Sequence, residues 1–72
     1  MTQDDARAEL AVLTARQLEA LILRAKGETL EGIGQAMGCS AKGAEAHMKQ
    51  VAKRLQCNSY AACWLVGKAG MG

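Results

Sequence analysis

The 72-residue sequence contains no proline and no phenylalanine, and its aromatic residues are one tyrosine and one tryptophan. A hydrophobic core must therefore be built from aliphatic side chains. The β-branched residues that favour strands are scarce, whereas alanine, leucine, glutamate, glutamine, lysine and arginine, which favour helices, are abundant. These proportions predict an all-α chain.

Cysteine and histidine are also few. Cys39, Cys57 and Cys63 are an odd number without a CxxC pair, which argues against a disulfide framework and against a zinc site. We expect each to be a small buried apolar residue in a reducing compartment. The single histidine, His47, has no second histidine or suitably spaced acid beside it. Neither a metal nor another cofactor is expected.

Long hydrophobic runs are absent. No segment approaches the roughly 20 apolar residues that a membrane span requires, and no signal peptide pattern begins the chain. No glycine-rich phosphate loop follows a strand, and no Ser/His/Asp or Cys/His arrangement is present. A domain of this size buries only about 60% of its unfolded surface, which leaves little core to support a catalytic cleft. We expect a compact cytoplasmic module that binds a partner, not an enzyme and not a membrane protein.

The net charge of +2 is unevenly distributed. Residues 1–12 carry −2, residues 13–38 carry 0, residues 39–55 carry +3 and residues 56–72 carry +1. One short segment thus holds most of the positive charge, and such a local basic stretch indicates an acidic partner better than the total does.

Two helices are predicted before this basic segment. Thr14 and Gln17 form the pattern of a capping box, which starts a helix that ends near Gly27. Thr29 is the predicted N-cap of the second helix, and Gly38 ends it. Glycines at 32 and 34 lie inside that helix and each costs about 1 kcal/mol relative to alanine. We expect close packing against a neighbouring helix as the reason for both.

A third helix is predicted over 41–55, with Ser40 as its N-cap. Its apolar residues follow helical spacing and should face the core: Ala44, Met48, Val51 and Leu55. The opposite face should be exposed: Lys42, Glu45, Ala46, Lys49 and Lys53. A last helix is expected over about 60–69, capped by Ser59, and a short helix within 3–12.

Two short helices, a turn at 38–40 and a third helix capped by serine form a helix-turn-helix pattern. Over about residues 13–66 the sequence resembles the LuxR/GerE-type DNA-binding domain in register and without a gap. The positions that carry this resemblance are Leu13, Thr14, Arg16, Gln17, Glu19, Leu21, Ala25, Gly27, Ile33, Met37, Gly38, Cys39, Ser40, Ala44, His47, Val51, Lys53, Arg54 and Leu55.

The resemblance implies a small four-helix, tetrahelical bundle over 13–69, preceded by an N-terminal segment 1–12 with a short helix and followed by a tail 70–72. It implies a stand-alone member, without a sensor or receiver domain, in the cytoplasm of a bacterial-type cell and on the nucleoid when bound to DNA. It implies that helix 41–55 enters the major groove of double-stranded DNA and that the last helix pairs two copies. Base contacts are expected from Glu45, Ala46 and Lys49. Phosphate contacts are expected from Lys42, Gly43, His47, Lys53, Arg54 and Arg16. A dimer interface is expected at Ala62, Cys63, Trp64 and Val66.

Some alternatives remain open at this stage. His47 lies near the edge of the apolar stripe, so a packing role is as plausible as a phosphate contact. The acidic Glu45, together with Gly43 where the family has threonine and Gln56 where it has glycine, motivates a second function. In that alternative the chain is a protein-interaction module, an anti-activator or co-regulator, which pairs with another LuxR-type regulator and binds DNA weakly or not at all. Contact with RNA polymerase is a third hypothesis, which depends on fold analogy alone.

Overall fold

The computed structural model describes residues 1–71, and the last residue of the predicted tail 70–72 lies outside this range. The described chain forms five helices and no strand. These are α1 (Gln3–Leu10), α2 (Ala15–Ala25), α3 (Leu30–Met37), α4 (Ala41–Leu55) and α5 (Ser59–Lys68). The predicted all-α bundle with a helix-turn-helix and an additional N-terminal helix is confirmed.

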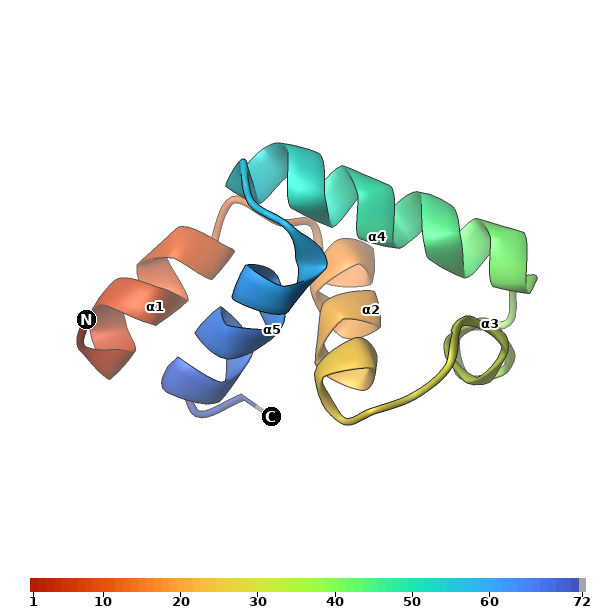
Figure 1. Cartoon of the computed structure of the whole chain (residues 1–72), viewed down its shortest axis with the longest axis horizontal. Coiled ribbons are helices and arrows are strands. Elements are labelled where there is room, and N and C mark those ends of the chain that lie inside the picture. The colour runs from red at the N-terminus through yellow and green to blue at the C-terminus, as the bar shows by residue number, and fades with distance from the viewer. Residues whose placement is uncertain (72) are drawn as a thin grey trace.

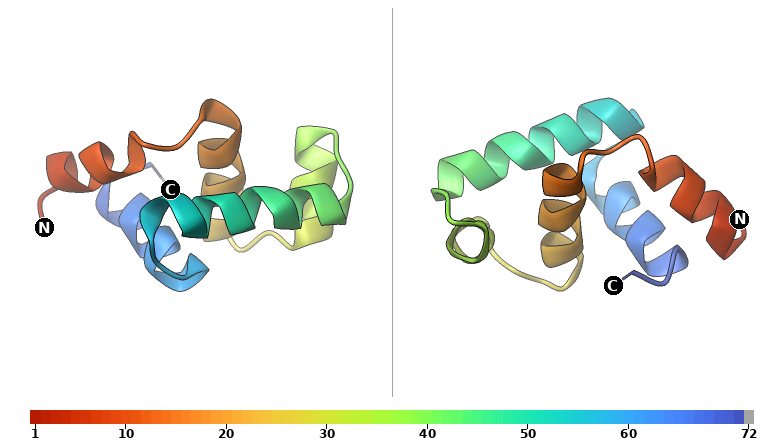
Figure 2. Two further views of the ribbon diagram at one scale, coloured as in Figure 1. Left: turned by 90° about the horizontal axis from the view of Figure 1, so that it is seen from above. Right: turned by 180° about the vertical axis from the view of Figure 1, so that it is seen from behind.

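The longest helix, α4, runs along one side of the molecule and the other helices lie beneath it (Figure 1). α3 packs under its N-terminal end, α2 under its middle and α5 beside α2. α1 packs against α5, so that α1 and α3 lie at opposite ends of the molecule (Figure 2). The described chain therefore has an elongated shape of 34 × 20 × 19 Å, with one long side of α4 left uncovered.

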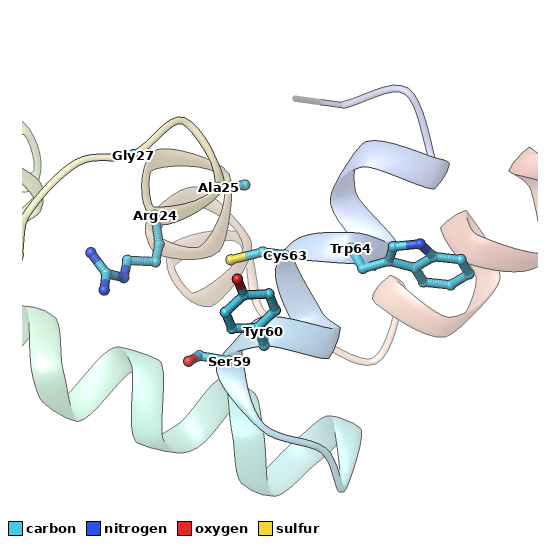
Figure 3. A pocket seen from close by; sticks show the side chains of 7 residues that line it. All are labelled: Arg24, Ala25, Gly27, Ser59, Tyr60, Cys63 and Trp64. Atoms are coloured by element: carbon cyan, nitrogen blue, oxygen red, sulfur yellow. The ribbon is translucent and has the colours of Figure 1, made fainter.

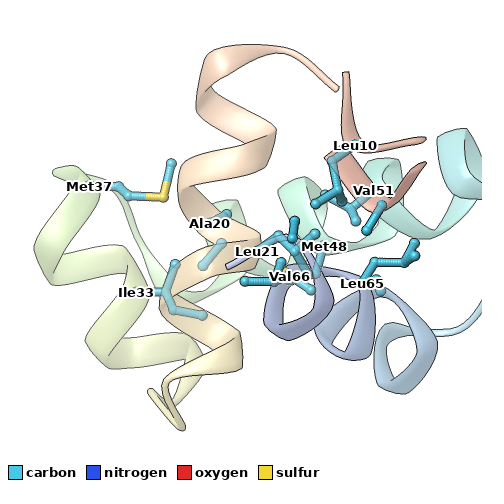
Figure 4. Close-up of a cluster of buried hydrophobic side chains, with 13 residues drawn as sticks. Leu10, Ala20, Leu21, Ile33, Met37, Met48, Val51, Leu65 and Val66 are labelled. Carbon is cyan, nitrogen blue, oxygen red and sulfur yellow. The ribbon is translucent and has the colours of Figure 1, made fainter. Parts of the chain in front are cut away.

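The core is aliphatic and draws on all five helices (Figure 4). Its largest fully buried side chains are those of Leu10, Leu21, Ile33, Val51 and Val66. Met48 is buried as predicted, and Met37 in α3 is buried as well. The three cysteines are free thiols that are half-buried at the edge of this core, less buried than the sequence suggested.

Side-chain caps begin the helices, and most were predicted correctly. The Thr14 hydroxyl accepts from the Gln17 amide at 3.2 Å, and Gln17 Oε1 accepts from the Thr14 amide at 3.0 Å, which completes the predicted capping box. Thr29 and Ser40 cap α3 and α4. The predicted cap of the last helix is wrong by one residue. Asn58 has the extended backbone, and its Oδ1 accepts from the Ala61 amide at 2.9 Å, so Ser59 is already helical.

The N-terminal helix α1 has a side-chain cap at its start and hydrogen bonds to the end of α5. A capping box between Thr2 and Asp5, which the sequence reasoning missed, begins it. Two of its side chains then reach the end of α5: Gln3 Nε2 and Arg7 Nε donate to the Ala69 carbonyl at 3.1 and 3.0 Å. α1 therefore covers one side of α5, a point that decides below which α5 residues can meet a partner.

The two glycines inside α3 have different surroundings, and the expectation of a neighbouring helix for both is wrong. A Cβ on Gly34 would lie 2.6 Å from the Cys39 carbonyl oxygen and 2.9 Å from the carbonyl carbon of Ser40. Gly34 therefore packs against the backbone of the turn and not against a helix. A Cβ on Gly32 would meet only the side chains of Glu28 and Thr29.

Candidate nucleic-acid interface

The turn between α3 and α4 fixes the direction in which α4 leaves. Gly38 ends α3 in the left-handed conformation, with φ of 73°. The amide of Cys39 then donates to the Gly34 carbonyl at 2.7 Å, which closes the end of α3. One residue later the Ser40 hydroxyl accepts from the Gly43 amide at 3.1 Å and starts α4. The end of α3 at Gly38 and the cap of α4 at Ser40 thus lie within three residues and form the turn of the predicted helix-turn-helix.

The two faces of α4 separate as the sequence predicts. Ala44, Met48 and Val51 are buried, and Leu55 is half-buried against the core. All five residues predicted for the opposite face are exposed: Lys42, Glu45, Ala46, Lys49 and Lys53. α4 is fifteen residues long and its outer side is uncovered by the rest of residues 1–71, so it has the shape required to enter a major groove.

Two of the three predicted base-contacting residues are paired with each other. Lys49 Nζ lies 3.0 Å from Glu45 Oε1, one helical turn away, and these side chains are 75% and 50% exposed. Ala46 lies between them in sequence and presents a methyl group to solvent. The centre of the face therefore has a donor, an acceptor and a small apolar group together.

The predicted phosphate-contacting residues of α4 differ in how accessible they are. Lys42 and Lys53 are exposed on the outer side of α4. The Gly43 amide is already bonded to Ser40, so Gly43 does not offer its N–H to a phosphate while the cap is intact. A Cβ at position 43 would lie 3.3 Å from the Cβ of Cys39, which gives this glycine a packing role beside the turn. His47 is half-buried at the edge of the face.

Both predicted arginines are exposed and donate hydrogen bonds to carbonyls of other segments. Arg16 Nη2 donates to the Met37 carbonyl at 2.9 Å, and its Nη1 lies 3.5 Å from Glu19 Oε2. This guanidinium joins α2 to the end of α3, where a cation is favoured by the helix dipole. Arg54 Nη1 donates to the Val12 carbonyl at 3.3 Å and so joins the end of α4 to the segment before α2.

The α5 residues predicted for a dimer interface do not share one face. Ala62 and Val66 are 0% exposed, because they pack into the core. Within the chain they therefore have no surface to offer to a second copy. Trp64 is 55% exposed and Cys63 is half-buried. Tyr60, one turn before Trp64 and 87% exposed, was missed, although two aromatic residues at i, i+4 spacing were visible in the sequence.

An open groove of about 530 Å³ lies between these aromatic side chains and the end of α2. Figure 3 shows Tyr60 and Cys63 turned toward α2, while the indole of Trp64 points away from it. Burial raises the pKa of the Cys63 thiol, an effect that the charge of Arg24 partly offsets. The thiol is therefore protonated near neutral pH.

Two further findings concern metal binding and membrane crossing within residues 1–71. In the part of the chain that the structure describes, His, Cys, Asp and Glu side chains do not gather in groups of three or more that could hold a metal ion. None of the helices within 1–71 has both the length and the apolar character that crossing a membrane requires.

Comparison with known proteins identifies the family of this chain. Residues 11–66 match the family described as bacterial regulatory proteins, luxR family. No curated protein and no solved structure matches the chain. The matched segment includes α2, α3 and α4, the turn between α3 and α4, and most of α5. The chain therefore belongs to this family of DNA-binding transcription regulators, as the resemblance of its sequence implied.

Proposed function

We propose that this regulator binds DNA as a homodimer and reads sequence with the exposed face of α4 in the major groove. The observation that carries the proposal is the uncovered outer side of α4, where cations gather around Glu45, Ala46 and Lys49. Residues 39–55 carry a net charge of +3, whereas the whole chain carries +2, so the other residues together are slightly acidic. Electrostatic attraction to a duplex is therefore concentrated on this side of the molecule.

Within this face we assign two roles. Lys49 donates to guanine O6 or N7, and the Ala46 methyl contacts a thymine methyl. Lys42 and Lys53, near the two ends of the face, contact phosphates and position the helix without selecting a sequence. Arg16, Arg54 and His47 remain predicted phosphate contacts, and the two arginines would have to add such a contact to the carbonyls that they already hold.

The second copy is proposed to pair through the exposed side of α5. Tyr60 and Trp64 lie one helical turn apart and are both exposed; Tyr60 turns toward α2 and the indole of Trp64 points away from it (Figure 3). Large exposed aromatic residues are typical of protein interfaces. Gly67 lies one turn further along, and a Cβ there would have open space within 4 Å. Within residues 1–71 no contact requires a glycine at this position, and the missing Cβ would let a partner helix approach closely. Two α4 helices related by such a two-fold axis would read half-sites about one helical turn apart.

The test is selection of duplexes from a random-sequence pool by the purified protein, followed by fluorescence anisotropy with the selected duplex at several salt concentrations. We expect an enriched motif with two-fold symmetry and an affinity that falls steeply with salt. Lys49→Ala should weaken binding to the selected duplex by about 1–3 kcal/mol and relax one position of the motif. Lys53→Ala should weaken binding to all duplexes alike and reduce the salt slope by about 1.

Lys26→Ala serves as the control, because it removes one exposed cation from the C-terminal end of α2, which points away from α4 in Figure 1. Its affinity and motif should stay close to those of the unchanged protein. Equal losses on every duplex for the lysine 49 and lysine 53 variants would contradict the division of roles. Weak binding without any enriched motif would contradict sequence-specific reading. It would favour the second function, pairing with another LuxR-type regulator through the aromatic side of α5.

A further inference from the structure

We propose that the Glu45–Lys49 pair acts as one reading unit that selects a C·G base pair in each half-site, with Glu45 accepting from cytosine N4 and Lys49 donating to guanine. This inference depends on the proposed function, because it assigns a target to the same face of α4. Its basis is the 3.0 Å contact between Lys49 Nζ and Glu45 Oε1 on the exposed side of that helix.

The pair contributes little to folding. Both side chains are at least half exposed, and exposed pairs at i, i+4 spacing add only a few tenths of a kcal/mol to a helix. An acid on a face that meets phosphates also weakens binding to every duplex. Stability therefore gives little reason for a carboxylate at position 45, and general affinity for DNA opposes it.

Pairing changes what the carboxylate does. With Lys49 beside it the two side chains are neutral together, so the unit is neither strongly attracted to phosphates nor strongly repelled by them. Lys42 and Lys53 remain exposed for the phosphates. The pair instead offers an acceptor and a donor about 3 Å apart, which is a hydrogen-bonding pattern and not a net charge.

A C·G pair has the complementary pattern in the major groove. The cytosine N4 amine is a donor, and guanine O6 and N7 are two neighbouring acceptors. An A·T pair has the adenine N6 donor, but its acceptors, adenine N7 and thymine O4, are on different bases, so it offers the ammonium one acceptor per base where guanine offers two side by side. Glu45 precedes Lys49 along α4, and this order determines which DNA strand carries the cytosine.

The experiment compares Glu45→Gln with the unchanged protein by selection from the same random-sequence duplex pool. Glutamine prefers adenine, to which its amide can both donate and accept. We expect the unchanged protein to enrich C·G at one position of each half-site and the variant to lose that preference or change it to A·T. On duplexes that differ only at this position, the preference of the unchanged protein for C·G should be roughly tenfold, and that of the variant close to onefold.

Glu9→Gln is the matched control, because it removes the same charge from an exposed position on α1, outside the reading face of α4. Both variants should bind unselected DNA slightly more tightly, but the control should keep the motif. If Glu45→Gln only tightens binding and keeps the same motif, Glu45 is a solvated acid and this inference is wrong, while the proposed function stands. If the unchanged protein enriches no motif, it is the proposed function that fails.

Discussion

At the scale of single residues, Gln56 has the least suitable backbone conformation. It ends α4 with φ of 54° and ψ of 41°, and within 1–71 it is the non-glycine residue with positive φ. The Cys57 amide donates to the Ala52 carbonyl at 3.1 Å across this turn, so the left-handed residue is needed to close the helix end. The other left-handed helix ends, at Gly27, Gly38 and Gly70, use glycine.

Gln56→Gly should therefore stabilise the protein. A side chain in the left-handed region costs roughly 1–2 kcal/mol. Replacement by glycine removes this cost, but part of the gain is lost because glycine has more conformational freedom in the unfolded chain. We expect a gain of about 0.5–1 kcal/mol in the free energy of unfolding, or a few degrees in Tm, measured by circular dichroism during heating. Gln50→Gly, at an exposed position in the middle of α4, should instead lose about 1 kcal/mol. A loss in both variants would contradict this explanation.

At the scale of elements, the helix-turn-helix depends on the close approach between α3 and its own turn. Gly34 lies against the backbone of Cys39 and Ser40, and backbone atoms cannot move aside as the end of a side chain can. Gly34 therefore fixes how α4 leaves α3, and with it the direction of the reading face. Gly32, two residues earlier in the same helix, has no such backbone neighbour.

Alanine at these two positions should have opposite effects. Gly34→Ala places a methyl group 2.6 Å from the Cys39 oxygen and should lose about 1–3 kcal/mol, because the turn must shift. Gly32→Ala meets only movable side chains and should gain up to about 1 kcal/mol from helix propensity. Urea unfolding followed by circular dichroism measures both. A gain in both variants would show that the turn is not under this constraint.

At the scale of the whole molecule, α1 and the core together decide which side of α5 remains free. Ala62 and Val66 face inward and α1 packs against a further part of the helix, whereas Tyr60 and Trp64 stay exposed. Adjacent residues on this helix therefore have different tasks: Leu65 is 6% exposed and belongs to the core, whereas Trp64 is 55% exposed.

Trp64→Ala should weaken self-association at least tenfold and change the free energy of unfolding of the monomer by less than about 1 kcal/mol, since most of its indole is outside the core. Sedimentation equilibrium at several protein concentrations measures the first, and denaturant unfolding at low concentration measures the second. Leu65→Ala is the comparison and should lose about 2–5 kcal/mol. Unchanged self-association of the tryptophan variant would exclude this side of α5 as the dimer interface.

The sequence by itself determined the helices and the two faces of α4. Caps such as Thr14–Gln17 and Ser40 depend on atoms three residues apart, and the division between Ala44, Met48 and Val51 and the outer lysines depends on helical periodicity. Both are local, so reasoning along the chain finds them. The error at Ser59 was small for the same reason: Asn58 and Ser59 are adjacent candidates for one cap.

Only the tertiary structure decided which residues are free for partners. Arg16 and Arg54 look like simple surface cations, yet their bonds reach carbonyls 21 and 42 positions away. The last helix has apolar residues on most of its surface, so its periodicity does not distinguish the core side from a dimer side. The packing of α1, α2 and α4 against it makes that choice, because it buries Ala62 and Val66 and leaves Tyr60 and Trp64 in solvent.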